Sequence, residues 1–256
     1  MGPVAAGPPI VFLGPTLPVE EAGRILPADY RPPAAQGSVV AAAGARRPAA
    51  ILLIDGVFKG EPAIRHKEIL WALSRGIPVF GAASMGALRA AELHRHGMVG
   101  VGLVYRWYRR FPLLPDDAVA VLHGPPEMGS RPLTQALVDL RMTLRAAARE
   151  GAIGHAARTR LERAAASLNF RERTLAAAVE HAFASELDRA ARTALAGALA
   201  ARLVDQKRRD ALHALCVVRG LHQGGGLVAG PGFPFTWTTA FLRDLRHAGL
   251  ETAIRW

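Results

Sequence analysis

The feature that most constrains the fold is an alternation of unbroken apolar runs with helical patterns between residues 49 and 97. The first run is "AAILLIDGVF" (Ala49–Phe58), which is aliphatic without polar alternation, as in a strand covered on both faces. A helical pattern follows it, then a second run, "IPVFGAAS", and a second helical pattern. This order and spacing predict a βαβα unit with parallel strands.

Both strand ends of this unit are expected at the same edge of the sheet. A right-handed crossover brings Asp55-Gly56, after the first strand, next to Ala82–Ser84, after the second. A shorter apolar run, Ile10–Leu17, is punctuated by Gly14-Pro15 and predicts a further buried strand. The expected fold class is therefore α/β, with a parallel-sheet amino-terminal part and a mostly helical carboxyl-terminal part.

The remaining segments are assigned from apolar periodicity and from helix start and stop signals. A strand is expected over Asp117–Pro125, and nearly continuous helix from Ile153 to Gly220, followed by a flexible connection and one short helix. Further helices are expected over residues 18–26, 36–45, 61–76, 85–97, 97–110 and 129–150, the last with Thr134 as a possible cap, and the long helical part is expected to break near Leu168-Asn169, Ser185 and Ala201. We expect a core of residues 1–150 that carries the active site, and a helical region of residues 151–256 packed on it as one unit.

A net charge of +11 suggests a nucleic-acid partner, because clustered basic side chains release counterions from phosphates. The arginines are instead spread over most of the expected helices, aromatic residues are sparse and no nucleic-acid-binding module is recognisable. We therefore expect no nucleic-acid partner. Lysine is rare, with only Lys59, Lys67 and Lys207, and each stands out because only lysine readily loses its proton in a protein site.

The chain is expected to be a cytoplasmic protein without a membrane span. No apolar run reaches the roughly 18 residues of a membrane helix, and the first residues lack the basic n-region of a signal peptide. The single cysteine, Cys216, excludes an intramolecular disulfide and is expected as a small buried residue in a helix. The histidines lack paired spacing, so no metal ion and no cofactor are expected.

Ser84 lies among small residues where the second strand becomes a helix. At such a junction a hydroxyl is next to the free N–H groups of the helix, which can stabilise a developing oxyanion. The string Ala82-Ala83-Ser84-Met85-Gly86 resembles a nucleophile elbow with alanine in place of the first glycine. The alternative is that Ser84 merely caps the helix by accepting a backbone hydrogen bond.

A nucleophilic serine needs a base, and Lys67 is the best-placed candidate. It lies at the start of the helix after Asp55-Gly56, near the same sheet edge. Burial and the positive end of a helix dipole lower the pKa of a lysine, and a neutral Lys67 can take the proton of Ser84. The alternative is a surface lysine that pairs with Glu68 or Glu61.

Several dense segments closely resemble the TfuA family, whose members accompany YcaO enzymes in peptide-backbone thioamidation. They are "VFLGPTLP", "LLIDGVF", "HKEILWALSRGIPVFGAASMGALRAAEL" and "GMVGVG", in the family's order, and they cover roughly the first 140 residues. The later segment "DQKRRDAL" (Asp205–Leu212) also looks similar to the family.

This resemblance implies a hydrolase that acts on the C-terminal thiocarboxylate of a ThiS-like, ubiquitin-fold sulfur carrier. The released sulfide would serve the YcaO enzyme, which activates a peptide amide with ATP, and the protein would also help that enzyme engage its peptide. The resemblance places the family's Ser–Lys pair on Ser84 and Lys67. Lys207, in the other family-like segment, is the alternative base.

The chemistry of the surrounding residues is consistent with this activity. Backbone N–H groups near Met85 and Gly86, or near Gly56 on the adjacent strand end, would hold the oxyanion. Asp55 would orient Lys67, or alternatively cap the next turn. Arg89, one turn into the helix, would steer a carboxylate or thiocarboxylate, or alternatively form an i, i+3 pair with Glu92.

Two other functions stay open at this point. One is a non-catalytic accessory protein that only docks the YcaO enzyme and its peptide, in which case the small residues around Ser84 serve helix–sheet packing. The other is a phosphate- or nucleotide-binding α/β protein that uses the helix N-terminus at Ser84. Both "GPTLP" and "GAASMGA" fail the P-loop pattern, and no Rossmann glycine fingerprint follows a strand.

Overall fold

The structure is a computed structural model that describes residues 7–45, 47–57, 62–125 and 131–250. Phe58 and Glu61, where a predicted strand ends and a predicted helix begins, lie outside the described residues, as does Lys59. Two compact units make up the chain. Unit 1 comprises Met1–Leu113 and Arg208–Trp256, and unit 2 comprises Leu114–Lys207. These bounds differ from the division at residue 150 that was expected from the sequence.

Unit 1 is built on one parallel sheet of five strands, in the order β2-β1-β3-β4-β5. The strands are β1 (Ile10–Phe12), β2 (Asp29–Arg31), β3 (Ile51–Leu53), β4 (Val79–Ala82) and β5 (Val99–Val101). The α/β class with parallel strands is thereby confirmed. The chain passes from β1 to β2 on one side of the sheet and from β3 to β4 on the other. The carboxyl ends of the neighbours β1 and β3 therefore form a topological switch point, which is where open α/β sheets bind ligands.

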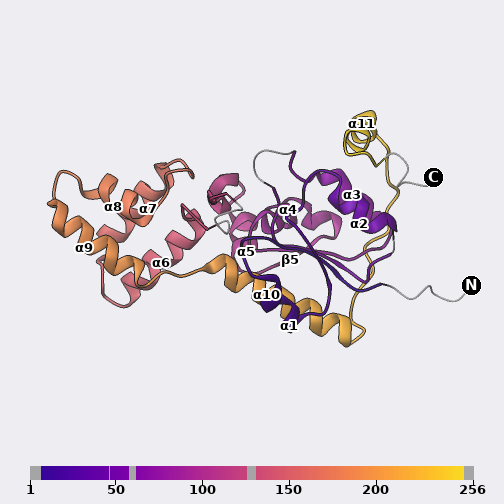
Figure 1. The fold of residues 1–256 in the computed structure, drawn as a ribbon, viewed down its shortest axis with the longest axis horizontal. Helices are drawn as coiled ribbons and strands as arrows, with labels where there is room; N and C mark the ends of the chain where they lie inside the picture. Colours follow the sequence, from indigo (N-terminus) through magenta and orange to yellow (C-terminus); the bar gives the residue numbers. More distant parts are fainter. Residues whose placement is uncertain (1–6, 46, 58–61, 126–130, 251–256) are drawn as a thin grey trace, which may run out of the picture. The chain divides into compact units, whose positions relative to one another are not determined.

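Helices cover both faces of this sheet (Figure 1). One face carries α2 (Ser38–Ala45), α3 (His66–Ser74) and α4 (Met85–Leu93), and the other carries α1 (Val19–Ile25) and α10 (Gln206–Gln223). The core on the α1 side joins strand residues to α10, including Val11, Leu52 and Phe80 with Ala214 and Val218. A helix from late in the sequence, α10, therefore covers one face of a sheet whose strands come early in the sequence. Within unit 1, α5 (Leu103–Arg110) follows β5 directly.

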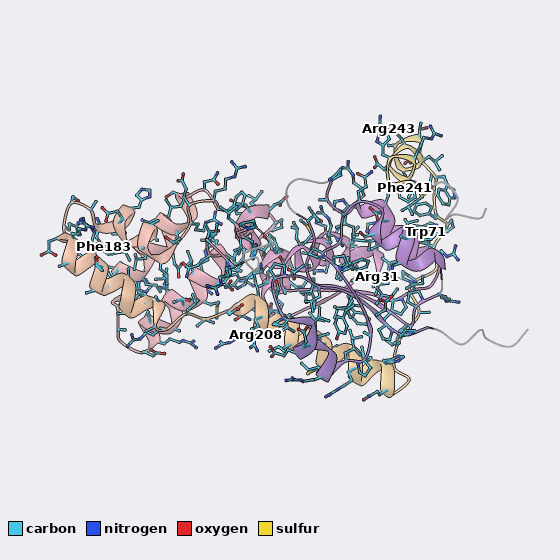
Figure 2. The ribbon with its side chains drawn as sticks, in the orientation of Figure 1. Arg31, Trp71, Phe183, Arg208, Phe241 and Arg243 are labelled. Carbon is cyan, nitrogen blue, oxygen red and sulfur yellow. The ribbon has the colours of Figure 1, made fainter. Side chains whose placement is uncertain are left out.

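The last described segment of unit 1 returns to the starts of α2 and α3. Its helix, α11 (Thr239–His247), contacts the residues before α2 and α3 through Asp244. Gln36 Nε2 donates to the Asp244 carbonyl at 2.9 Å, and Arg65 lies 3.5 Å from the Asp244 carboxylate. Phe241, on α11 in Figure 2, packs against Phe235 and Trp237 with ring centroids 5.5 and 5.8 Å away.

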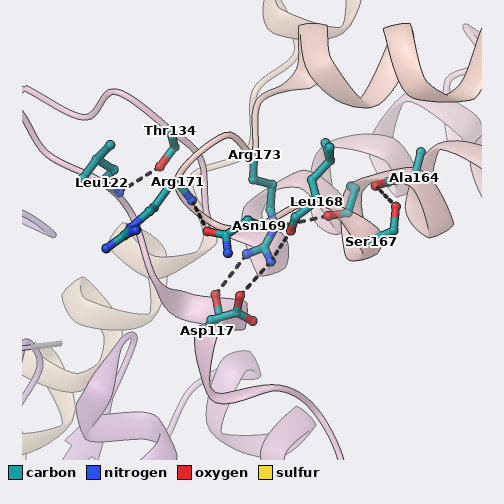
Figure 3. A network of polar contacts seen from close by, with 10 residues as sticks. Asp117, Leu122, Thr134, Ala164, Ser167, Leu168, Asn169, Arg171 and Arg173 are labelled. Carbon is teal, nitrogen blue, oxygen red and sulfur yellow. Dashed lines mark hydrogen bonds and ion pairs between the residues drawn. The ribbon is translucent and has the colours of Figure 1, made fainter. Parts of the chain in front are cut away.

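Unit 2 is helical. It contains the short 3-10 helix η2 (Asp116–Val119), α6 (Leu137–Arg149), α7 (His155–Ser167), α8 (Leu175–Phe183) and α9 (Arg189–Ala200). A buried Arg173 ties its loops together, as Figure 3 shows, because its guanidinium donates to the carbonyls of Ala165, Leu168 and Asp117 and to the Asp117 carboxylate. The predicted interruptions near Leu168-Asn169, Ser185 and Ala201 are confirmed.

Several predicted details are wrong. Residues 97–110 are not one helix, because β5 occupies Val99–Val101 as an edge strand and α5 starts only at Leu103. Asp117–Pro125 is not a strand, since η2 takes its first residues. Thr134 caps no helix, because α6 begins after Ala136 and the Thr134 hydroxyl accepts the Leu122 N–H instead. Cys216 is exposed rather than buried, because it faces away from the sheet on α10.

No helix within the described ranges combines the length and the apolar character needed to cross a bilayer.

Candidate functional site

The switch point between β1 and β3 is organised by the buried carboxylate of Asp55. Asp55 Oδ2 accepts the backbone N–H groups of Gly14 at 2.9 Å and Thr16 at 3.2 Å, and Oδ1 accepts the Thr16 hydroxyl at 2.6 Å. Three donors thus fix the turn after β1 against the end of β3. Neither role expected for Asp55 matches this arrangement, because its carboxylate holds a turn that precedes it by about forty residues and no bond to Lys67 is found in the described chain.

Ser84 follows a strained turn at the end of the neighbouring strand β4. Ala83 has φ +65°, which is costly for a residue with a Cβ, and the Ser84 N–H closes a tight turn onto the Ala82 carbonyl at 2.7 Å. Strain of this kind is found where the surrounding fold holds a side chain in a required direction. Ser84 is 8% exposed, so a reactant must reach it as a thin chain.

The Ser84 hydroxyl does not cap α4. Ser84 occupies the N-cap position, but its side chain makes no capping hydrogen bond, and none to any other described residue is found. The Ser84 carbonyl instead accepts the N–H groups of Ala87 and Leu88. The capping alternative for this side chain is therefore wrong in this structure, and the hydroxyl is available for another partner.

Two glycines let α4 start directly on the strand ends. A Cβ on Gly86 would lie 1.8 Å from the Leu53 carbonyl oxygen, and a Cβ on Gly81 would lie 2.1 Å from the Gly86 carbonyl oxygen. The Gly86 N–H donates to the Ile54 carbonyl at 3.3 Å. Gly86 therefore serves helix–sheet packing, and its N–H is already used, which removes it from the expected oxyanion donors.

Two of the N–H groups that were expected as oxyanion donors remain available. Within the described part of the chain, neither the Met85 N–H nor the Gly56 N–H has an acceptor. The two residues touch, because a Cβ on Gly56 would lie 2.7 Å from Met85 Cγ. Gly56 and Met85, the residue after Ser84, were both expected as oxyanion donors and are thus in contact with each other.

Three other helix starts of unit 1, those of α2, α3 and α5, are occupied by internal carboxylates. Glu68, 1% exposed, accepts the Arg65 N–H at the start of α3 and the Val39 N–H at the start of α2. Burial raises the pKa of Glu68, although these backbone hydrogen bonds oppose the shift. Asp210 likewise accepts the Val104 N–H at 2.7 Å at the start of α5. The start of α4 has no such carboxylate among the described residues, so it is open to an anion from outside.

Lys67 is the second residue of α3 and therefore lies on the sheet edge where it was expected. Its Nζ donates to the Thr236 carbonyl at 2.9 Å and lies 5.0 Å from the centroid of the Phe235 ring. These contacts replace the expected surface pairing with Glu68, whose carboxylate is buried in helix capping. Among the described residues Lys67 makes no bond to Ser84 or Asp55.

Arg89 is engaged in an ion pair with Glu92. Arg89 donates to Glu92 Oε2 at 2.7 Å, and His66 lies 2.8 Å from the same oxygen. Burial raises the pKa of Glu92, but the hydrogen bonds from His66 and Arg89 outweigh this and leave it below its ordinary value. The i, i+3 alternative for Arg89 is confirmed, and a second donor goes to the Ile64 carbonyl at 3.3 Å.

Lys207 belongs to unit 2 and is buried there. Its Nζ donates to the Val119 carbonyl at 3.0 Å, and its N–H donates to Asp139 Oδ1, which also accepts the Gln206 N–H at 2.8 Å. Burial raises the pKa of Asp139 to about 7, with the positive charge of Lys207 opposing and the negative charge of Asp205 adding to the shift. This environment gives Lys207 a structural role at the start of α10.

The model of the TfuA-like protein family matches residues 55–174. Over these residues, just under half of the chain, the protein is similar to TfuA-like proteins. The matched span begins at Asp55 and includes Gly56, Lys67, Ser84 and Arg89, whereas Lys207 lies beyond it. No curated protein matches the chain.

Two residues of this edge, Gly14 and Thr16, were not among the predicted site residues. The segment "GPTLP" directly after a buried strand was the available signal, since strand ends at a switch point bind ligands. Within the described ranges no group of three or more His, Cys, Asp or Glu side chains is placed to hold a metal ion.

Proposed function

We propose that this protein hydrolyses the C-terminal thiocarboxylate of a ThiS-like sulfur carrier and supplies the sulfide to a YcaO enzyme. The observation that carries the proposal is the turn at Ala83-Ser84. It presents an uncapped hydroxyl at the carboxyl edge of a parallel sheet, next in the chain to Met85, whose N–H has no acceptor among the described residues; Gly56, whose N–H also has none there, packs against Met85. TfuA-like proteins accompany YcaO enzymes, and this association supports the choice of partner.

The uncapped start of α4 suits an anionic substrate. A thiocarboxylate carries a negative charge, and the start of α4 supplies the Met85 N–H, which has no acceptor among the described residues, and the positive end of the dipole. The small exposed fraction of Ser84 suits a reactant at the end of a narrow Gly-Gly tail. The other helix starts that are capped by Glu68 and Asp210 offer no such place.

In the proposed reaction Ser84 Oγ attacks the thiocarboxylate carbon, and Lys67 takes the hydroxyl proton. The Met85 and Gly56 N–H groups donate to the oxygen on which charge develops. The carbon–sulfur bond then breaks, the proton passes to sulfur, and hydrosulfide leaves an acyl-serine ester. Water cleaves this ester, which returns the carrier with an ordinary carboxylate and restores the Ser84 hydroxyl.

The proposed base requires a movement of Lys67. In the structure its Nζ is held by the Thr236 carbonyl and lies near the Phe235 ring. The mechanism therefore includes a rotation of this long side chain toward Ser84 when substrate is bound, as catalytic hydrogen bonds often form only in the substrate complex.

The decisive experiment measures sulfide released from a thiocarboxylated carrier. We expect the Ser84→Ala variant to lose at least about a thousandfold of the rate, since the nucleophile is removed. The matched control is Ser74→Ala, because the Ser74 hydroxyl only donates to the Trp71 carbonyl within α3. Sulfide release by Ser84→Ala at the wild-type rate, with an unchanged circular dichroism spectrum, would exclude the hydrolase mechanism.

The second candidate is a non-catalytic protein that docks the YcaO enzyme and its peptide. It is favoured by the close packing at Gly81 and Gly86, which explains the small residues without catalysis, and by the engagement of Lys67 elsewhere. Wild-type protein that binds the YcaO enzyme but releases no sulfide from any thiocarboxylated carrier would support this candidate.

A further inference from the structure

A second concentration of charge lies within unit 2, between α6 and α7. Arg141 and Arg145 are one turn apart on α6, and Arg158 and Glu162 are one turn apart on α7. Glu162 Oε1 lies 3.7 Å from Arg145 Nε and 3.9 Å from Arg158 Nε. Glu162 thus lies between Arg158 of its own helix and Arg145 of the facing helix, and its charge also acts on Arg141.

The polar atoms of this cluster are buried but incompletely satisfied. Arg141 Nε and Arg158 Nε have no hydrogen-bond acceptor among the described residues, and Glu162 Oε1 has no donor within hydrogen-bond distance there. Native proteins leave few buried polar atoms in this state, and a bound water, ion or ligand normally accounts for them. Three such atoms on two facing helices point to one bound group.

The electrostatic setting favours an anion. Burial lowers the pKa of the Arg141 guanidinium. The negative charge of Glu162 opposes this shift, and the positive charges of Arg145 and Arg173 add to it. The nearby Arg173 is fully engaged by Asp117 and by loop carbonyls, so it does not compete for a ligand. The side chains of Arg145 and Arg158 are 43% and 25% exposed, which leaves the cluster open to solvent.

We propose that Arg141, Arg145, Arg158 and Glu162 form a binding site for a phosphate group. A tetrahedral phosphate presents oxygens in several directions, so it can accept hydrogen bonds from guanidinium groups on two helices at once, whereas a carboxylate presents its two oxygens in one plane. Hydrogen phosphate also carries an O–H that can donate to Glu162 Oε1. The site belongs to unit 2, whereas the residues of the proposed hydrolase belong to unit 1, and it does not depend on that activity.

The test is a calorimetric titration of the full-length protein with inorganic phosphate, at an ionic strength held constant with chloride. We expect saturable binding that is weakened about tenfold or more in Arg141→Gln, because a charge-assisted donor pair is lost. The control is Arg163→Gln, an exposed position on α7, which should bind phosphate within about twofold of wild type. Ser84→Ala should also bind as wild type, which separates this inference from the proposed hydrolysis.

A second variant and a second ligand complete the test. Arg145→Gln removes a partly exposed side chain, so it is expected to fold even if Arg141→Gln does not, and to weaken phosphate binding. Methyl phosphate distinguishes two classes of ligand. If it binds as tightly as inorganic phosphate, the site accepts phosphate esters; if it binds more weakly, the ligand is inorganic phosphate. Absence of saturable binding, equal affinity in all variants, or tighter binding of malonate than of phosphate would overturn the proposal.

Discussion

The charged side chains that the two units of this protein bury are largely of opposite sign; the exception is Asp139, a carboxylate of unit 2 that accepts backbone N–H groups at the start of α10. The other buried charged side chains among the described residues are the carboxylates of Asp55, Glu68 and Asp210 in unit 1, and the cations of Arg173 and Lys207 in unit 2. The carboxylates accept backbone N–H groups at helix starts and turns. The cations donate to backbone carbonyls of loops and turns.

This difference follows from which backbone groups each architecture leaves unpaired. In a parallel sheet the helix starts gather at the carboxyl edge, so unpaired N–H groups accumulate there and carboxylates satisfy them. The helices of unit 2 leave N–H groups unpaired at their starts, which Thr174 and Asp188 cap. They also leave carbonyls unpaired in the loops, which the long basic side chains of Arg173 and Lys207 reach. The start of α4 at Ser84, which has no carboxylate cap among the described residues, is where we place the substrate.

The largest effect is expected from removing the carboxylate at the switch point. Asp55→Ala leaves three buried donors of the Gly14–Thr16 turn without an acceptor, so we expect a loss of about 3 kcal/mol or more in the free energy of unfolding. Urea unfolding followed by circular dichroism measures this loss. Asp29→Ala is the control, because Asp29 pairs only with Arg31 on an edge strand. A loss below about 1 kcal/mol would mean that the carboxylate does not organise this edge.

The second prediction tests which of two lysines, Lys67 or Lys207, is the base that takes the proton of Ser84. Lys67→Arg in unit 1 keeps the charge but cannot act as a base, so sulfide release should fall at least about a hundredfold. Lys207→Arg in unit 2 should keep the rate per folded molecule and lower only the melting temperature, because its ammonium is buried against the Val119 carbonyl. The reverse result, with the rate lost in Lys207→Arg and kept in Lys67→Arg, would assign the base to Lys207.

The third prediction concerns the pH dependence of unit 2. The folded-state pKa of Asp139, about 7, is above its value in the unfolded chain, so the folded state binds the additional proton between about pH 4 and pH 7. Stability from this group is therefore present at low pH and falls as pH rises through 7, by up to about 1.4 kcal/mol per pH unit. Asp139→Asn, which can still accept the Gln206 N–H, should lose this slope. Equal slopes in denaturant unfolding of both proteins would contradict the prediction.

The smallest effect is expected for the complex with a YcaO enzyme. We expect the basic helices between Ile153 and Ala201 to face an acidic partner surface, and binding to survive in Ser84→Ala. Several of these arginines already pair within unit 2, as Arg160 does with Glu186 and Arg192 with Glu180. Raising the salt concentration should therefore weaken the complex by about tenfold or less. A complex that is insensitive to salt would indicate an apolar interface.

Long unbroken apolar runs made the central part of the fold predictable. The strand–helix alternation from Ala49 onward is confirmed because both faces of β3 and β4 are covered, and no short-range pattern competes with that signal. β2 escaped prediction because its residues, Asp29–Arg31, form a short polar edge strand. The run around Val99–Val101 satisfies helical and strand periodicity equally, and only pairing with β4 decides between them.

The position of the site could be predicted from the sequence, but the hydrogen-bond partners of its residues could not. Ser84 at a strand-to-helix junction is a local feature, so its place at the carboxyl edge followed from the alternation of elements. The partners of Asp55 and Lys67 come from Thr16 and Thr236, which are far away in the chain. Contacts at such separations depend on the order of strands and on the path of the last segment, which no local pattern records.

The position of α10 on the sheet has a consequence for the nascent chain. At about 5–20 residues per second of translation, seconds pass between the synthesis of β5 and that of α10, because Leu114–Lys207 is made in between. During that interval the sheet residues that later meet α10, among them Val11 and Leu52, have only α1 to cover them. Unit 2 can complete its local helical contacts first, whereas the sheet must wait for the chain to return. A ribosome that stalls inside unit 2 therefore displays an uncovered apolar sheet face, which is the kind of surface that chaperones bind.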